Sequence, residues 1–109
     1  MRIWLIGAEQ AGCNAIVQLR KNANIELIVS AAVENPKAVK DGLIRKVDHV
    51  EYVTPININT LARRIRPDLI LLDSGADKRT MSNVTGGVAF TEALYQEMMA
   101  TSDYACLVL

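Results

Sequence analysis

A glycine-containing segment near the start of the chain has the residue types of an anion-binding turn. The segment is Gly7-Ala8-Glu9-Gln10-Ala11-Gly12. It lies between a short apolar run and a segment with helical spacing. The start of a helix presents N–H groups without partners and a partial positive charge, and phosphate groups bind there. We therefore expect these six residues to contact the phosphates of a nucleotide.

The glycine pattern is incomplete at its middle position. A dinucleotide-binding turn has the form Gly-x-Gly-x-x-Gly, and its second glycine lets the backbone approach the pyrophosphate. Gly7 and Gly12 match the first and third positions, but Glu9 stands at the second. A carboxylate there would repel a pyrophosphate. The alternative is that the two glycines only permit a tight turn from strand to helix.

A second polar segment, Asp73-Ser74-Gly75, directly follows the most apolar run of the chain. Because ligands of a parallel α/β sheet bind beyond the carboxyl ends of the strands, we expect all three residues to contact the ligand. They open a long polar stretch, residues 73–87, that could be a functional loop or a solvated one. Further candidates in this stretch are Asp77, Lys78, Arg79, Thr80, Ser82 and the helix start Thr85-Gly86-Gly87.

The other chemistry-bearing residues do not form a catalytic or metal-binding set. His49 has no evident carboxylate or cysteine partner, so we expect it to be structural. Cys13 lies one turn into the first helical segment; its pKa would be lowered if the thiol faced the helix start, whereas a buried packing thiol is the alternative. Cys106 lies on an apolar run and is expected in the core.

Short apolar runs alternate with segments of helical spacing along the chain. The expected strands are residues 2–6, 25–32, 49–53, 68–72 and 104–109. The expected helices are residues 9–22, a short one from Pro36 with Asn35 as N-cap, residues 60–66 with Asn59 as N-cap, and one after Gly87 with Phe90, Leu94 and Met98 on one face. This alternation predicts an α/β fold, a three-layer doubly wound parallel sheet of about five strands in the order 3-2-1-4-5, with a crevice between the first and fourth.

Residues 2–36 resemble the opening of a Rossmann-type NAD(P)-binding domain, especially the N-terminal domain of glucose–fructose-oxidoreductase-like and homoserine-dehydrogenase-like enzymes. The run Asn24-Ile-Glu-Leu-Ile-Val and the later Glu34-Asn35-Pro36 carry this resemblance. It implies NAD or NADP as cofactor, with an acidic residue after the second strand holding the adenosine ribose. Ser30 stands near that position and Glu34 comes slightly later. Without the acid a 2′-phosphate fits better, with Lys37 and Lys40 as the nearest cations.

Residues 66–73 resemble the strand of two-component receiver domains that ends in the phosphorylated aspartate. This second resemblance would give that role to Asp73. The chain departs from the receiver pattern after its first strand, where Glu9 is the one carboxylate in place of a magnesium-binding pair. An additional strand at residues 49–53 also precedes Asp73.

The composition favours one compact domain over residues 1–109. Half of the 109 residues are hydrophobic, and 12 basic residues balance 12 acidic ones. This balance argues against a nucleic-acid partner, which normally selects a basic surplus. No apolar run is long enough to cross a membrane, and the N-terminus enters a strand instead of a signal peptide. Two widely spaced cysteines favour a reduced, cytoplasmic setting.

These features predict a small stand-alone NAD(P)- or nucleotide-binding module, for binding or sensing or as a cofactor subunit. Five strands use the whole length, so we expect no substrate domain and no self-sufficient enzyme. One alternative is a protein-interaction domain that kept the fold and lost the ligand; a receiver-like domain and an enzyme dependent on Asp73, Cys13 or His49 are others. The last strand has few charges, so we expect a homodimer or a partner subunit.

Overall fold

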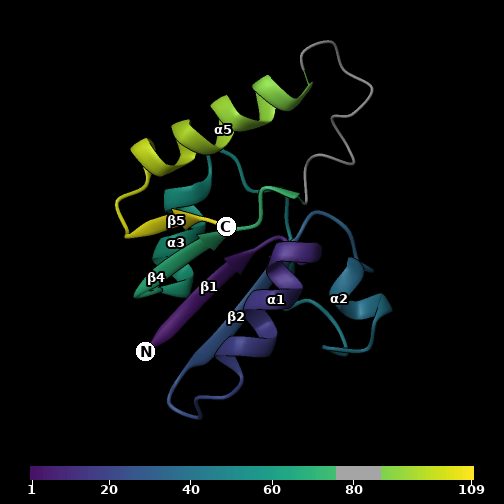
Figure 1. Ribbon diagram of the computed structural model, residues 1–109. Helices are drawn as coiled ribbons and strands as arrows, with labels where there is room; N and C mark the ends of the chain where they lie inside the picture. Colours follow the sequence, from purple (N-terminus) through teal and green to yellow (C-terminus); the bar gives the residue numbers. More distant parts are fainter. Residues whose placement is uncertain (76–86) are drawn as a thin grey trace.

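Five strands and four helices alternate in the described part of the chain, as the ribbon diagram shows (Figure 1). The computed structural model describes residues 1–75 and 87–109, with the side chains of residues 1–75 and 93–109. The strands are β1 (Arg2–Ile6), β2 (Glu26–Ala31), β3 (His49–Val50), β4 (Leu69–Leu72) and β5 (Cys106–Val108). The helices are α1 (Gln10–Leu19), α2 (Lys37–Lys40), α3 (Ile58–Ile65) and α5 (Gly87–Thr101).

All strand pairs are parallel, and the sheet order is β3-β2-β1-β4-β5. This order confirms the predicted 3-2-1-4-5 topology and the α/β class. β1 lies at the centre, where Trp4 pairs with Ile28 of β2 and Ile70 of β4. The chain reverses its direction of travel across the sheet between β1 and β4. The residues after these two strands therefore meet at the carboxyl edge, as in Rossmann-like folds.

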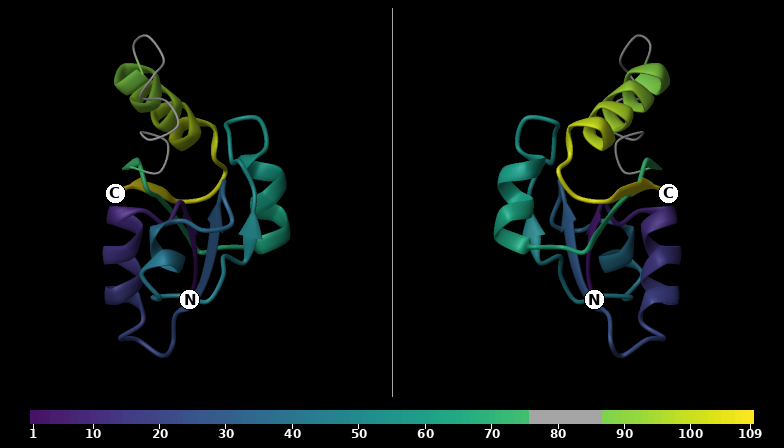
Figure 2. Two further views of the ribbon diagram at one scale, coloured as in Figure 1. Left: turned by 90° about the vertical axis from the view of Figure 1, so that its right-hand side faces the viewer. Right: turned by 90° about the vertical axis from the view of Figure 1, so that its left-hand side faces the viewer.

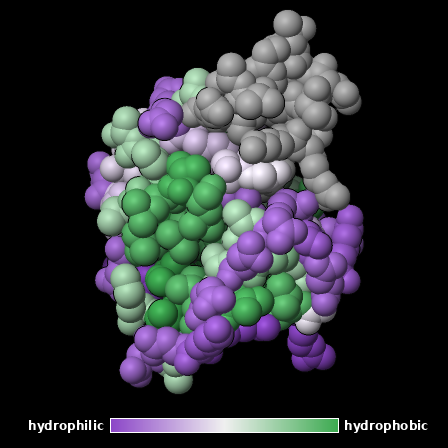
Figure 3. Space-filling model, viewed as in Figure 1, coloured by the Kyte–Doolittle hydropathy of each residue, from purple (hydrophilic) through white to green (hydrophobic). Residues whose placement is uncertain are grey.

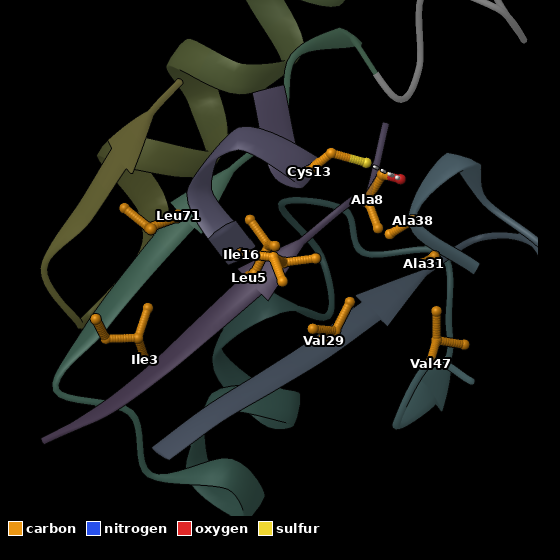
Figure 4. Close-up of a cluster of buried hydrophobic side chains, with 10 residues drawn as sticks. All are labelled: Ile3, Leu5, Ala8, Cys13, Ile16, Val29, Ala31, Ala38, Val47 and Leu71. Atoms are coloured by element: carbon orange, nitrogen blue, oxygen red, sulfur yellow. Dashed lines mark hydrogen bonds between the residues drawn. The ribbon is translucent and has the colours of Figure 1, made fainter. Parts of the chain in front are cut away.

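One face of the sheet packs against α1 and α2. Its core contains Ile3 and Leu5 of β1, Val29 of β2, Leu71 of β4 and Ile16 of α1, which the close-up shows together (Figure 4). Alternate residues of each strand point to this face, as the two-residue period of a strand requires. The turn from strand to helix closes this core, since Ala8 is fully buried in it.

The opposite face packs against α3 and α5. Side views show α1 and α2 on one side of the sheet and α3 on the other (Figure 2). Trp4 and Ile70 meet Ile58 of α3 and Met98 of α5 in this second core. Met98 of the predicted stripe is fully buried and Leu94 is partly buried, whereas the side chain of Phe90 lies outside the described residues.

The helix starts differ from the predictions at two places. α3 begins at Ile58 with Asn57, not Asn59, as its N-cap. The Asn57 side chain instead binds the preceding turn, accepting the Thr54 N–H at 2.7 Å. Asn59 holds the chain after α5, since its side chain donates to the Thr101 carbonyl and accepts the Asp103 N–H. α2 begins at Lys37 with Pro36, not Asn35, as its N-cap.

Three elements are shorter than their patterns predict by three residues or more. β3 covers two residues, because the chain turns away from β2 after the Glu51 N–H donates to the Ala31 carbonyl. α1 ends at Leu19, three residues before the predicted end. Turns follow it, in which the N–H groups of Lys21 and Asn22 each donate to a carbonyl three residues earlier. β5 is confined to the three residues that pair with β4.

A buried hydrogen bond crosses the sheet between β1 and β2 and should measurably stabilise the fold. The fully buried Trp4 Nε1 donates to Ser30 Oγ at 2.8 Å. Ser30→Ala leaves the indole N–H unpaired and should lower the free energy of unfolding by about 1–3 kcal/mol. Urea unfolding checks this value. In a Trp4→Phe background the same substitution should cost much less, and an equal cost in both backgrounds would contradict the pairing.

Candidate functional site

The turn between β1 and α1 has the geometry that its two glycines predict. Gly7 adopts φ +93°, a conformation in which a side chain is strained. A Cβ on Gly12 would lie 2.6 Å from the Gly7 carbonyl oxygen, so no larger residue fits there without a shift. Gly7 is therefore required by its backbone conformation, and Gly12 by the close approach of α1 to the end of β1.

The Asp73 carboxylate occupies the start of α1. Its Oδ2 accepts the N–H of Gly12 at 2.7 Å and the N–H of Glu9 at 2.9 Å. Its Oδ1 accepts the N–H of Gly75 at 2.9 Å, and the residue is 0% exposed. In a nucleotide-binding turn, backbone N–H groups at this position bind phosphate. Here a carboxylate from the end of β4 binds them.

The Glu9 carboxylate points to α2 and not to the start of α1. It accepts the N–H of Lys37, the first residue of α2, at 2.7 Å. The Ala8 carbonyl accepts the N–H of Ala38 at 3.0 Å, which adds a second link between the turn and α2. A carboxylate is favourable at a helix start, so Glu9 stabilises α2. The residue that breaks the glycine pattern is thus a helix cap.

A cavity of about 210 Å³ lies beside this turn, beyond the carboxyl ends of β1, β2 and β3. Most of its walls are apolar, and three charged side chains line it: Glu9, Lys40 and Glu51. The other lining residues are Ile6, Gly7, Ala8, Ala31, Ala32, Val33, Asn35, Pro36, Tyr52, Val53 and Tyr95. Typical sites for drug-sized ligands measure about 300–1,000 Å³, so this cavity would enclose only part of such a ligand.

The structure divides the predicted site residues into three groups. Gly7, Ala8 and Glu9 line the cavity. Gly12, Asp73 and Gly75 join in the hydrogen bonds at the start of α1. The remaining residues do not line the cavity, namely Gln10, Ala11, Ser30, Glu34 and Ser74.

The residues of this last group lie outside the cavity, on α1, in the core or at the surface. The exposed Gln10 donates to Asn14 within α1, and Ala11 is half-buried on the same helix. Ser30 is buried with Trp4 and lines a separate cavity of about 50 Å³. Ser74 Oγ donates to the Leu109 carbonyl at 3.1 Å, and Glu34 is exposed.

Several cavity residues were not predicted from the sequence. Ala31, Ala32 and Val33 line the cavity because they stand at the end of β2. Their place at the carboxyl end of a strand is the signal that could have predicted them, since their residue types are ordinary. The sequence predicts that Glu51 and Tyr52 lie within a strand, but they follow the end of β3. Tyr95 reaches the site from α5, and its hydroxyl donates to the Asp73 carbonyl at 3.1 Å. The loop candidates Asp77, Lys78, Arg79, Thr80, Ser82, Thr85 and Gly86 lie outside the described residues.

Cys13 is a buried packing thiol, whereas Cys106, expected in the core, is only partly buried against it. Cys13 is buried beside Ala8, whose carbonyl lies 3.8 Å from Sγ (Figure 4). Burial, followed by the charge of Asp41, raises the pKa of the Cys13 thiol. Burial also raises the pKa of the Cys106 thiol to about 11. The helix start therefore does not activate Cys13, in contrast to the first of its two predicted alternatives.

The chain matches no known family model, no curated protein and no solved structure. Its Rossmann-like architecture therefore stands on the strand order and layers alone. Across residues 1–75 and 87–109, no three His, Cys, Asp or Glu side chains group as a metal site requires. Among the same residues, no helix has the length and apolarity to cross a membrane.

Removal of the Asp73 carboxylate should destabilise the fold and expose an anion site. Asp73→Ala leaves the N–H groups of Glu9 and Gly12 unpaired, and we expect a loss of about 3 kcal/mol or more, since each bond to a charged group contributes about 1.5–3 kcal/mol. Millimolar sulfate or phosphate should raise the melting temperature of this variant but not that of the wild type. Asp103→Ala, at an exposed site, is the control. Equal stability of both variants would refute the role of Asp73.

The raised thiol pKa values predict slow alkylation of the folded chain. A pKa of about 11 in place of 9.0 lowers the thiolate fraction of Cys106 at pH 8 by about a hundredfold. Its reaction with iodoacetamide should therefore accelerate with pH beyond pH 9, where an ordinary thiol levels off. Mass spectrometry of native and urea-unfolded chain measures both rates. Equal rates in the two states would contradict the burial of the thiols.

Proposed function

We propose that the chain is a small binding or sensing module for a nucleoside or mononucleotide, with no catalytic apparatus of its own. The observation that carries this proposal is the cavity of about 210 Å³ beyond β1, β2 and β3. In a Rossmann-like sheet, this edge is the usual position of a bound nucleotide. The resemblance of residues 2–36 to NAD(P)-binding domains supports the same class of ligand.

The lining of the cavity suits a base and a ribose. Ala31, Ala32 and Val53 supply small apolar surfaces against which a flat base can lie. The exposed Glu51 at the rim supplies carboxylate oxygens, which accept hydrogen bonds from ribose hydroxyl groups. Lys40 at the same rim supplies a cation for a monophosphate. These groups replace the missing acidic residue at the end of β2.

The position of Asp73 argues against the usual binding of a dinucleotide. Its carboxylate takes the N–H groups of Glu9 and Gly12 that would bind the pyrophosphate, and it would repel that group as well. NAD and NADP therefore fit only if their adenosine half enters the cavity and the pyrophosphate stays outside. We accordingly expect them to bind more weakly than AMP.

A calorimetric titration with adenosine, AMP, NAD and NADP tests the proposal. AMP should bind best, and Lys40→Ala should reduce its affinity to that of adenosine, because the variant lacks the cation. Ala32→Leu should fill the cavity and weaken AMP binding by about tenfold or more, equivalent to 1.4 kcal/mol. Ala23→Leu, at an exposed residue away from the cavity, is the matched control. Failure of all four ligands to bind would overturn the proposal.

A protein-interaction domain without a ligand is the second candidate, and the internal carboxylate at the start of α1 favours it. In this case none of the four compounds binds, and Ala32→Leu leaves the chain folded.

A receiver-like role receives no support from the site. Asp73 is buried and hydrogen-bonded through both carboxylate oxygens, which leaves no access for phosphoryl transfer.

A further inference from the structure

The outer edge of β5 carries backbone groups that no described segment of the chain binds. β5 ends the strand order, with β4 on its inner side. The Ile70 N–H donates to the Ala105 carbonyl, and the Leu109 N–H donates to the Leu72 carbonyl, both at 2.8 Å. Backbone groups of successive residues alternate in direction along a strand. The N–H and C=O groups of Cys106 and Val108 therefore point away from the sheet.

The side chains of this edge are apolar and exposed. Leu107 is 56% exposed, Val108 38% and Leu109 40%. The space-filling view shows hydrophobic residues gathered over the β4–β5 end of the sheet (Figure 3). Residues 104–109 contain no charged residue and no proline, the usual devices that protect an edge strand from pairing. The edge thus has the properties of a strand that pairs with another chain.

We propose that two copies of the chain pair through β5 as antiparallel strands about a two-fold axis at Leu107. In this register Cys106 of each copy lies opposite Val108 of the partner subunit. These are the two residues whose backbone groups point outward, so each such pair exchanges both of its hydrogen bonds. The two sheets then form one continuous sheet.

The side chains on this edge are complementary in the same register. Leu107 meets Leu107 of the partner subunit on the axis, and Leu109 meets Ala105 of the partner subunit, a large residue beside a small one. The occupant is a second copy because the contact is self-complementary, as a two-fold interface requires. A formal net charge of zero gives no net long-range repulsion between the copies. Parallel addition would not close and would continue into fibres.

Sedimentation equilibrium of the full chain at about 10–200 μM tests the pairing, with Val108→Pro as the informative variant. Proline at this position removes an outward N–H and no hydrogen bond to β4, so the variant should be folded by circular dichroism and monomeric. Val108→Ala keeps the N–H and should remain a dimer. A monomeric wild-type chain, a dimer that survives Val108→Pro, or open-ended assembly would each overturn the proposal.

Cysteine cross-linking tests the register even if Val108→Pro fails to fold. In a Cys106→Ser background, Leu107→Cys places two thiols on the axis at a Cα separation of about 4.5 Å, within the range of a disulfide. Mild oxidation should convert most of this variant to a covalent dimer. Ile56→Cys, at a residue 94% exposed and away from β5, is the matched control and should remain largely monomeric. Equal cross-linking of the two variants would refute this register.

Discussion

The Asp73 carboxylate joins the end of β4 to the start of α1, and the geometry of the carboxyl edge follows from this contact. It sits at the point where the strand order reverses, the position that a Rossmann-like sheet offers to an external anion. Because the anion here belongs to the protein, Gly12 must approach it without a side chain. The open cavity lies on the side of β1, β2 and β3.

Two helix starts are thus stabilised by acidic side chains of the chain itself. Asp73 accepts N–H groups at the start of α1, and Glu9 accepts the N–H of Lys37 at the start of α2. These bonds connect β4, the first turn and the second helix into one unit. A nucleotide in the neighbouring cavity would find the N–H groups at both helix starts already hydrogen-bonded to carboxylates of the chain. Its base and ribose would then contribute more to binding than its phosphates.

The strand order could be predicted from the sequence because strand-like runs alternate with segments of helical spacing, the pattern of a doubly wound parallel sheet. The ends of the elements could not, since they depend on tertiary hydrogen bonds. Asn59 has the residue type of an N-cap, yet it binds Thr101 and Asp103, more than forty positions later. A propensity for helix starts contains no information on such partners.

The meeting of the two polar segments was predictable, but their contacts were not. Asp73 was expected beside the glycine turn, and it lies there. That its carboxylate binds Gly12, 61 positions away in the chain, follows only from the packed structure. Glu9 was expected to face a phosphate, but its carboxylate binds the start of α2. The cavity walls at Glu51 and Tyr95 come from the segment after β3 and from α5, neither of which has a motif.

The most direct test of ligand binding at the cavity is a ¹H–¹⁵N NMR titration of the chain with AMP. The amide signals of Ala32, Val33 and Glu51, at the cavity, should shift on binding. The amide signals of Glu9 and Gly12 should keep their positions, because Asp73 already binds these two groups. Large shifts of Gly12 and Glu9 with little change at Ala32 and Glu51 would show phosphate at the start of α1 and would contradict binding at the cavity.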